Sequence, residues 1–501
     1  MSLTMRISFL LPLLVLFGCA TQTASVEEAS LQYAEKHRPQ YHFSPPTQWM
    51  NDPNGMVFYE GEYHLFYQYY PDSNVWGPMH WGHAVSKDLI SWEHLPIAIY
   101  PDELGYIFSG SIVVDWENTS GFGVDNQPPL VAIFTQAVED EKAIPQKQSI
   151  AYSHDKGRTW SMFEGNPVID EDLRAFRDPK VFWHAPSANW IMSLAATTDN
   201  VGIRPDHIRF YASKDLKAWN KLSEFGYDIG SQAGKWECPD LFKMRVEGSK
   251  EEKWVLLVSI NLGGPQGGSA TQYFVGDFDG ETFQVDDDFI PEGDTAVWLD
   301  YGADNYAGVT WSDIPKEDGR RLFIGWMSNW DYAQVVPTYT WRSAMTLPRE
   351  LVLHRSGSSY RVHSRPVQEI SSYIGDELDM SQLTDSAYVI TARVEGEFEL
   401  TLANALGEEV ILRSTSNQFI IDRSKSGKVD FGPGFGTLHV TDLNGIEVEQ
   451  LQVFVDASSI EVFVNDGELV MTELIFPNEP YHTVRVRGTA GISIRSLASI
   501  W

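Results

Sequence analysis

The sequence predicts an all-β protein: a five-bladed β-propeller followed by a C-terminal β-sandwich. A repeat of about sixty residues runs through the first part of the chain and indicates propeller blades. Closely spaced, alternating strands in the last part indicate a sandwich. No long amphipathic helical pattern competes with these strand signals.

The repeat is marked by a short motif with an early Asp and a final Trp or Phe. It begins at Ser86, Ser153, Ser213 and, in a weaker form, at Asp277, so the intervals are 67, 60 and 64 residues. Each copy is expected to form a turn between two strands. The Asp side chain would cap the turn, and the aromatic side chain would return to the core.

Runs rich in β-branched and aromatic residues lie between the motifs and indicate strands. The clearest are residues 62–69, 130–135, 190–195, 254–260 and 321–326. Four strands per repeat make a propeller blade. Residues 35–348 number 314, and 314 divided by a repeat of about 64 gives about five units. We therefore predict five blades, with six blades as the alternative.

A change of pattern follows the propeller. Residues 349–376 are predicted to be a linker, because they contain the Ser- and Gly-rich stretch 355–359 and then Pro366. Residues 377–501 are predicted to form the sandwich. Its expected strands are residues 386–394, 397–403, 418–422, 451–456, 460–464 and 483–488. This second domain contains no distinctive pair of acidic motifs.

The N-terminus has the pattern of a secreted protein. Residues 1–18 resemble a signal peptide, with Arg6 followed by an apolar run that is too short to span a membrane. The run ends at Cys19 in a sequence that resembles a bacterial lipobox, so Cys19 is a candidate for lipidation and residues 19–34 for a tether. The alternative is an ordinary secreted protein cleaved near Ala20. Either way the mature protein would work outside the cytoplasm, touching a membrane only through a lipid anchor.

The charge balance restricts the partners. The 501 residues include 37 Lys and Arg against 69 Asp and Glu, a formal net charge of −32. This excludes nucleic acid as a partner, because phosphate backbones need clustered cations. A neutral carbohydrate is compatible with the charge. The 17 Trp and 21 Tyr could stack on sugar rings, although most are expected to pack in the core.

Metal and disulfide sites are not indicated. The chain has two cysteines, Cys19 and Cys238, too few for a disulfide framework or a zinc site. It has no Asp-x-Asp-x-Asp-Gly loop for calcium. We expect no metal and no cofactor. Nothing in the sequence indicates an oligomeric state.

Three acidic residues occupy nearly the same position in three repeats. Asp52, Asp178 and Glu237 precede the turn motif of their own repeat by 34, 35 and 40 residues. The innermost strand of each blade lines the central channel, and equivalent residues on these strands converge. The three carboxylates should therefore meet at one end of the channel.

Converging carboxylates with no basic partner for each suggest glycoside hydrolysis. One ionised carboxylate attacks the anomeric carbon, and a second, protonated one donates its proton to the leaving oxygen. Like charges held close together raise one pKa, which suits the acid. The alternative is purely structural, because Asp before Pro is common in turns.

Seven motifs with a distinctive composition occur in order along the chain: His42-Phe43-Ser44-Pro45, Trp49-Met50-Asn51-Asp52-Pro53-Asn54-Gly55, Phe108-Ser109-Gly110-Ser111, Arg177-Asp178-Pro179, Glu237-Cys238-Pro239-Asp240-Leu241-Phe242, Gln272-Tyr273-Phe274-Val275-Gly276 and Gly325-Trp326-Met327-Ser328-Asn329-Trp330. With these motifs the chain resembles glycoside hydrolase family 32, the β-fructosidases that include invertases, levanases and inulinases. The resemblance covers residues 38–501, and residues 456–463 resemble the family's C-terminal sandwich.

The resemblance implies a retaining mechanism on a propeller and sandwich. Asp52 would be the nucleophile and Glu237 the acid/base. Asp178 would hold fructosyl hydroxyls and stabilise the transition state, with Arg177 nearby fixing its ionisation. Cys238 would pack beside Glu237. The pocket for the terminal fructose would be lined by Asn51, Gln68, Trp76, Phe108, Ser109, Arg177 and Trp330. The plain alternatives are a polar strand residue for Gln68 and core packing for the tryptophans.

Levanase-like and inulinase-like members resemble the chain most, notably over residues 108–116 and 267–274. With a tether outside the cell, this favours exo-acting release of fructose from levan or inulin, with sucrose as a side substrate. The alternatives are an invertase acting mainly on sucrose and a non-catalytic fructan-binding surface protein. A sialidase is a further rival, because residues 153–160 resemble that family's Asp-box, but it needs an arginine cluster and a Tyr nucleophile.

Overall fold

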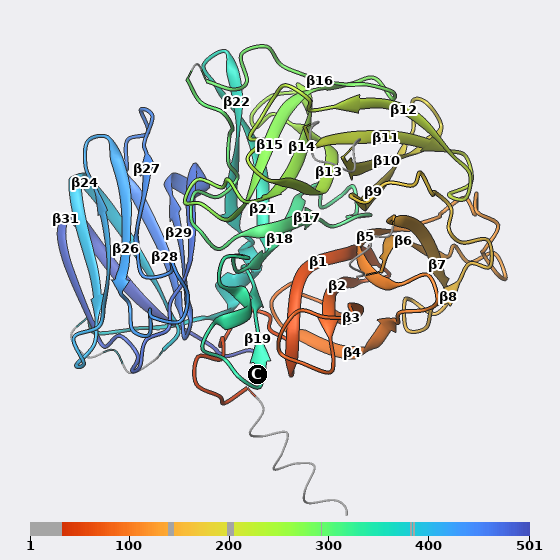
Figure 1. The fold of residues 1–501 in the computed structure, drawn as a ribbon. Coiled ribbons are helices and arrows are strands. Elements are labelled where there is room, and N and C mark those ends of the chain that lie inside the picture. Colours follow the sequence, from red (N-terminus) through yellow and green to blue (C-terminus); the bar gives the residue numbers. More distant parts are fainter. Residues whose placement is uncertain (1–32, 139–144, 198–204, 292, 381–382, 384–385) are drawn as a thin grey trace, which may run out of the picture.

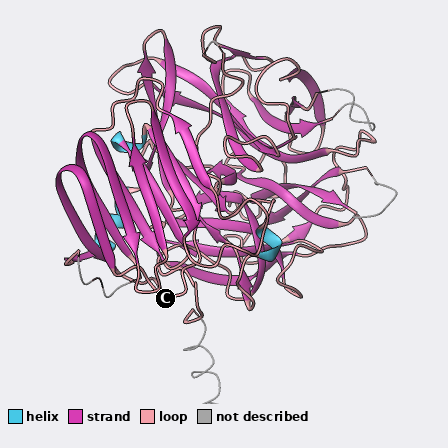
Figure 2. Ribbon diagram, turned by 60° about the vertical axis from the view of Figure 1, so that its left-hand side comes forward, coloured by secondary structure: helices cyan, strands magenta, loops and turns pink. Residues whose placement is uncertain are grey.

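The computed structural model describes residues 33–138, 145–197, 205–291, 293–380, 383 and 386–501. The predicted signal peptide, Cys19 and nearly all of the predicted tether lie outside the described residues. The all-β prediction is confirmed: five sheets surround a central axis, and a separate β-sandwich lies beside them (Figure 1). Within the described residues, helix is limited to short 3-10 turns (Figure 2).

Five blades, not six, make up the propeller. The first contains β1 (Gln48–Tyr59), β2 (Glu62–Tyr70), β3 (His80–Ser86) and β4 (Trp92–Ile99), and the second β5 (Tyr106–Val114), β6 (Leu130–Ala137), β7 (Lys147–Ser153) and β8 (Ser161–Met162). The third contains β9 (Phe176–His184), β10 (Asn189–Ala196), β11 (His207–Ser213) and β12 (Trp219–Phe225), and the fourth β13 (Lys235–Arg245), β14 (Glu252–Asn261), β15 (Ser269–Phe278) and β16 (Phe283–Val285).

The fifth blade closes the ring. Its strands are β17 (Tyr306–Thr310), β18 (Arg321–Met327), β21 (Arg349–Ser356) and β22 (Ser359–Pro366), and β20 (Ala344–Met345) also pairs with β18. After the 3-10 turn η1 (Ala333–Val335), β19 (Trp341–Arg342) pairs in parallel with β1 of the first blade. The end of the propeller is thereby hydrogen-bonded to its beginning.

The repeated motif forms the predicted turn between the third and fourth strands of a blade. In the first blade, Asp88 Oδ1 accepts hydrogen bonds from the backbone N–H groups of Ile90 (3.0 Å) and Ser91 (2.8 Å). The Trp92 indole N–H donates to the Leu89 carbonyl at 3.0 Å. Asp155, Asp215 and Asp279 cap the corresponding turns of the next three blades. The cap and the returning aromatic residue are confirmed.

The region predicted as a linker differs in the structure. Residues 349–366 form β21 and β22, and β21 pairs with β18, so they belong to the fifth blade. The Ser- and Gly-rich stretch is the hairpin turn between these strands, where Gly357 has φ 61°. The connection to the sandwich is short: η2 (Gln368–Tyr373) leads directly to β23 (Ile374–Glu377), which pairs with the last strand.

The sandwich is organised around the long strand β24 (Tyr388–Ala403), which joins the two runs predicted at 386–394 and 397–403. The first half of β24 pairs with β28 and the second half with β25, while β31 runs along both halves. An apolar core fills the space between the layers. The remaining strands are β25 (Glu409–Ser414), β26 (Gln418–Lys425), β27 (Leu438–Asp442), β28 (Gln450–Asp456), β29 (Ser459–Val464), β30 (Leu469–Leu474) and β31 (Thr483–Leu497), with the turn η3 (Asn465–Gly467).

Buried ion pairs join the two domains. His42, just before the propeller, has Nδ1 2.7 Å from Asp456 Oδ2 and Nε2 2.7 Å from Glu461 Oε1, both on the sandwich. Burial alone would lower the pKa of His42, but these two hydrogen bonds raise it to about 9. Arg349 of β21 also pairs with Glu461. Because breaking a buried pair is costly, the two domains are held in one relative orientation.

Among the residues that the structure describes, no helix has the length and hydrophobicity needed to cross a bilayer.

Candidate active site

The candidate site lies where the five inner strands begin. Strands β1, β5, β9, β13 and β17 neighbour one another around the channel. Each innermost pairing is irregular close to this end, which is typical of bulges that re-aim side chains beside active sites. The register shifts lie at Met50/Pro53, Ile107/Gly110, Ser193/Ala195, Glu237/Asp240 and Tyr306/Val309.

The structure brings the three predicted acids together, with Cys238 between two of them. Cys238 Sγ lies 3.8 Å from Asp52 Oδ2 and 3.6 Å from Asp178 Oδ2. The Cys238 backbone N–H also donates to Asp178 Oδ2 at 3.0 Å. Cys238 is buried and forms no disulfide, and its backbone lies in the left-handed region with φ 47°. Its burial, then the neighbouring carboxylates, raise the pKa of the thiol well above its usual value, which keeps the sulfur neutral.

Asp52 is held only by neutral donors. The Asn51 side-chain amide donates to Oδ1 at 2.9 Å, and the Ser109 hydroxyl donates to Oδ2 at 3.0 Å. Asn51 is fixed in turn by the Trp49 indole N–H, which donates to its side-chain oxygen at 2.7 Å. Burial, with the charge of Glu237, raises the pKa of Asp52 to about 6 despite these donors. Asp52 is therefore mostly ionised at neutral pH, with one fixed donor on each oxygen.

The pKa of Asp178 is raised further than that of Asp52. Asp178 is buried and has φ 65°, in the left-handed region, so the strand is interrupted at this residue. Burial and the charge of Glu237 raise its pKa to about 7, although Arg177 acts in the opposite direction. We expected Arg177 to keep Asp178 ionised. The charge of Arg177 acts in that direction, but burial outweighs it, and the guanidinium Nη1 donates to Glu237 Oε1 at 3.0 Å.

Glu237 is held by Arg177 on one oxygen and by Tyr306 on the other, where the phenol O–H donates to Oε2. The sequence analysis did not identify Tyr306. It lies at the start of β17, the inner strand of the fifth blade, so its position in the repeat matches that of the acids. A search for any polar side chain at that position, rather than for carboxylates alone, would have found it.

Several of the predicted sugar-binding residues contact one another or the segment that carries Asp52. Gln68 on β2 lies opposite the bulge that carries Asn51 and Asp52, and its buried side-chain nitrogen has no hydrogen-bond partner in the described structure. Trp76 and Phe108 meet edge to face with ring centroids 6.1 Å apart. Trp330 stacks against Trp49 at 5.8 Å. The site thus combines free polar groups with aromatic walls, as sugar sites do.

A metal-dependent site is not formed by these acids. No group of three or more His, Cys, Asp or Glu side chains within the described ranges is placed to hold a metal ion. The arrangement instead offers a mostly ionised carboxylate at Asp52, two further carboxyl groups and a neutral thiol. It is suited to proton transfer and to attack on an electrophilic carbon.

The raised pKa of Asp178 predicts a stability effect that depends on pH. Because this pKa lies above the ordinary value for Asp, the protein loses stability as pH rises through about 7. Asp178→Asn cannot ionise and keeps an oxygen for the Cys238 N–H. We expect it to be more stable than the wild type at pH 8, by about 1–3 kcal/mol, and equal to it near pH 3. Thermal unfolding at both pH values measures this.

The control is Asp215→Asn. Asp215 caps a turn, and hydrogen bonds from the Ala218 and Lys217 N–H groups outweigh its burial and lower its pKa. This variant should lose stability at pH 8 and little near pH 3, the opposite pattern. An Asp178→Asn protein no more stable than the wild type at pH 8 would contradict the assigned electrostatics.

Known proteins resemble this chain over nearly its whole length. The family model described as "Glycosyl hydrolases family 32 N-terminal domain" matches residues 42–366, and "Glycosyl hydrolases family 32 C terminal" matches residues 355–500. A levanase of Bacillus subtilis is 48% identical, over 93% of this chain and 71% of the levanase. An extracellular exo-inulinase of Aspergillus ficuum is 38% identical, over 94% and 96%.

Solved structures agree with the fold. The crystal structure of an exo-inulinase from Aspergillus awamori superposes with a TM-score of 0.85 at 36% identity, covering 94% of this chain and 100% of that one. A fructofuranosidase from Schwanniomyces occidentalis complexed with fructosylnystose has a TM-score of 0.82 at 33% identity, covering 93% and 99%.

Proposed function

Because the chain belongs to glycosyl hydrolase family 32 and is a glycoside hydrolase, we propose that it is a retaining, exo-acting β-fructosidase. It releases terminal β-D-fructosyl units from levan or inulin, with sucrose as a side substrate. The observation that carries the proposal is the meeting of Asp52, Asp178 and Glu237 at the start of the inner strands.

In this mechanism Asp52 is the nucleophile. Its carboxylate attacks the anomeric carbon of the terminal fructosyl unit, and the bond to the leaving oxygen breaks as a covalent fructosyl-enzyme forms. Asn51 and Ser109 donate to the two carboxylate oxygens and so fix the direction of attack. The charge of the attacking group is preserved because neither donor is a cation.

Glu237 transfers the proton. It protonates the leaving oxygen in the first step, then takes a proton from the water that hydrolyses the fructosyl-enzyme. Arg177 and Tyr306 hold one oxygen each, so they are positioning residues for this carboxyl group. The two half-reactions together consume one water and restore both carboxyl groups.

Asp178 does not form a bond to the substrate carbon. It accepts hydrogen bonds from fructosyl hydroxyls, and in its ionised form its charge stabilises the oxocarbenium-like transition state. Cys238 Sγ lies between Asp178 and Asp52, in contact with one oxygen of each. Gln68, Trp76, Phe108 and Trp330 form the walls and polar contacts of the fructose pocket.

The enzyme is proposed to work outside the cell. Residues 1–18 serve as a signal peptide, and Cys19 carries a lipid that tethers the protein to the cell envelope through residues 19–34. Secretion is supported by exo-inulinase relatives that are named extracellular. Labelling of the expressed protein with a palmitate analogue tests the anchor: loss of the label in Cys19→Ala supports it, and no label on the wild type rejects it.

Incubation with sucrose, inulin and levan, with free fructose measured, tests the function. We expect all three substrates to release fructose. From inulin and levan, fructose should be the only early product. Early oligosaccharides would indicate endo cutting, and activity confined to sucrose would favour an invertase. No fructose from any of the three would reject the enzyme in favour of a fructan-binding protein.

A further inference from the structure

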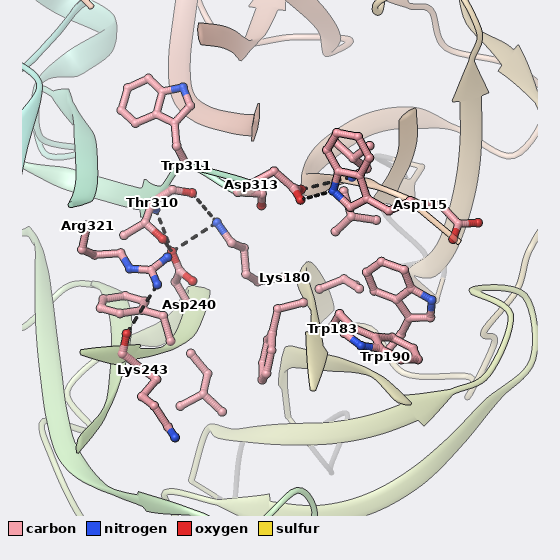
Figure 3. Close-up of a pocket in the computed structure, with 18 of the residues that line it drawn as sticks. Asp115, Lys180, Trp183, Trp190, Asp240, Lys243, Thr310, Trp311, Asp313 and Arg321 are labelled. Carbon is pink, nitrogen blue, oxygen red and sulfur yellow. Dashed lines mark hydrogen bonds and ion pairs between the residues drawn. The ribbon is translucent and has the colours of Figure 1, made fainter. Parts of the chain in front are cut away.

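A cavity lies at the end of the propeller channel opposite the three acids. Its volume is about 570 Å³, within the range of roughly 300–1,000 Å³ that is typical of small-molecule sites. The acids lie near the starts of inner strands, whereas the cavity is lined by residues further along the same strands, such as Lys180, Trp183 and Lys243 (Figure 3). The two sites therefore open at different faces of the propeller.

Buried polar side chains separate the two sites. The Thr310 backbone N–H and hydroxyl donate to Asp240 Oδ2 at 2.7 and 2.8 Å. Lys180 Nζ lies 3.2 Å from the same carboxylate oxygen and donates to the Thr310 carbonyl. These three residues are buried and fill the channel below the acids. A ligand in the cavity would not touch the catalytic carboxylates.

Exposed tryptophans mark the cavity as a sugar site. Of the 17 tryptophans, all within the described residues, only Trp116 and Trp183 are exposed, at 59% and 42%, and both line this cavity. The Trp116 indole N–H donates to Asp313 Oδ1 at 2.9 Å. Trp183 packs edge to face on Trp190 at 5.2 Å. Two indole faces are thus held in place toward solvent, where a sugar ring can stack.

The cavity also offers unused hydrogen-bonding groups. Asp240 Oδ1 is buried and has no partner in the described structure. Arg321 packs on the Phe242 ring and donates a long hydrogen bond, 3.4 Å, to the Lys243 carbonyl. The Arg321 guanidinium is therefore a multiple donor at the cavity wall that is only weakly occupied, whereas Asp240 Oδ1 lies buried behind it as an unpaired acceptor.

The charges around the cavity point to a neutral ligand. Three cations face four carboxylates, so no strong field of either sign selects an ion. The cations are Lys180, Lys243 and Arg321, and the carboxylates are Asp115, Glu117, Asp240 and Asp313. A neutral ligand with many hydroxyls and apolar ring faces fits both the indoles and the balanced polar groups.

We propose that this cavity is a second carbohydrate-binding site that takes a short segment of fructan. The inference rests on the proposed function, because it names the same class of substrate. A polymer bound here stays on the enzyme surface while other chain ends are cut at the acids. The effective concentration of chain ends at the catalytic site then rises without any change in the chemistry.

Calorimetry with a hydrolysis-deficient protein tests the site. Asp52→Asn is titrated separately with fructose, sucrose, a short inulin oligosaccharide and levan. We expect two binding events with the oligosaccharide. Adding Trp183→Ala should weaken one of them by roughly tenfold, whereas Trp183→Phe, which keeps an aromatic face, should retain most of the affinity. A single event in Asp52→Asn, or two unchanged events in the Trp183→Ala protein, would overturn the proposal.

Two further results separate the possibilities. If free fructose fills the second site as tightly as the oligosaccharide does, the site holds a product monosaccharide and the fructan assignment is overturned. In the otherwise wild-type protein, Trp183→Ala should raise KM for levan or inulin by several-fold and leave kcat/KM for sucrose unchanged. If the wild type hydrolyses no fructan yet shows the second event, the proposed function fails and the binding site stands.

Discussion

Replacing Asp52 by Asn should lower kcat on sucrose and on fructans by roughly four orders of magnitude. The amide is a poor nucleophile, so the fructosyl-enzyme cannot form. Fold and binding should survive, because Asn is isosteric and Asp52 is buried with a raised pKa. At pH 8 the variant should unfold no earlier than the wild type. Single-turnover rates measure the loss of activity, and thermal unfolding measures the stability of the variant.

Ser109→Ala is the matched control for Asp52. It removes one hydrogen bond to the same carboxylate and leaves the nucleophile in place. Its kcat should fall by about tenfold, in line with one lost hydrogen bond to a charged group. If Asp52→Asn kept even a tenth of the wild-type activity, Asp52 would not be the nucleophile.

Glu237→Gln should have an effect that depends on the leaving group. Sucrose and fructans have poor leaving groups that need a proton, so their hydrolysis should fall by roughly three orders of magnitude. An aryl β-fructoside with an acidic phenol needs no proton, and its first step should remain fast. Azide should then restore turnover by attacking the fructosyl-enzyme without a general base. Rates on both substrates, with and without azide, measure this.

Tyr306→Phe separates positioning from proton transfer. It removes the phenol that donates to Glu237 Oε2 and retains the ring that packs beside Trp326. We expect a fall of about tenfold on sucrose, with no rescue by azide. Glu237 would be ruled out as the acid/base if Glu237→Gln lost equal activity on sucrose and on the aryl β-fructoside and did not respond to azide.

Much of the fold could be predicted because the turn motif is local. An Asp that caps its own turn, followed by a returning aromatic residue, needs no tertiary information, and its spacing revealed the blades. The fifth blade lacks the motif, and its last hairpin turn is rich in Ser and Gly. The same composition indicates both a turn and a linker, so residues 349–366 were predicted wrongly.

Only those features of the site that depend on a residue's position along its strand could be predicted. The repeat placed Asp52, Asp178 and Glu237 at one end of the channel, where the structure has them. The bonding between side chains could not be predicted, because bulges and left-handed residues such as Asp178 and Cys238 re-aim neighbours individually. For that reason Arg177 was expected at Asp178 but pairs with Glu237. Tyr306 was missed because only acids were sought.

The buried ion pairs between the two domains could not be predicted from the sequence either. His42 lies more than four hundred residues from Asp456 and Glu461, and no local pattern indicates that a histidine will be buried between two acids. Such a buried pair depends on the docking of two finished domains.

The central claim is that Asp52 forms a covalent fructosyl-enzyme, which water then hydrolyses. Nuclear magnetic resonance of the first product tests this claim most directly. Sucrose is mixed with the wild-type enzyme, and the anomers of free fructofuranose are followed before they equilibrate. Two displacements at the same carbon restore its configuration, so β-fructofuranose should appear first, and Asp52→Asn should release none. If the α-anomer appeared first, a single displacement by water would be operating and Asp52 would not be the nucleophile.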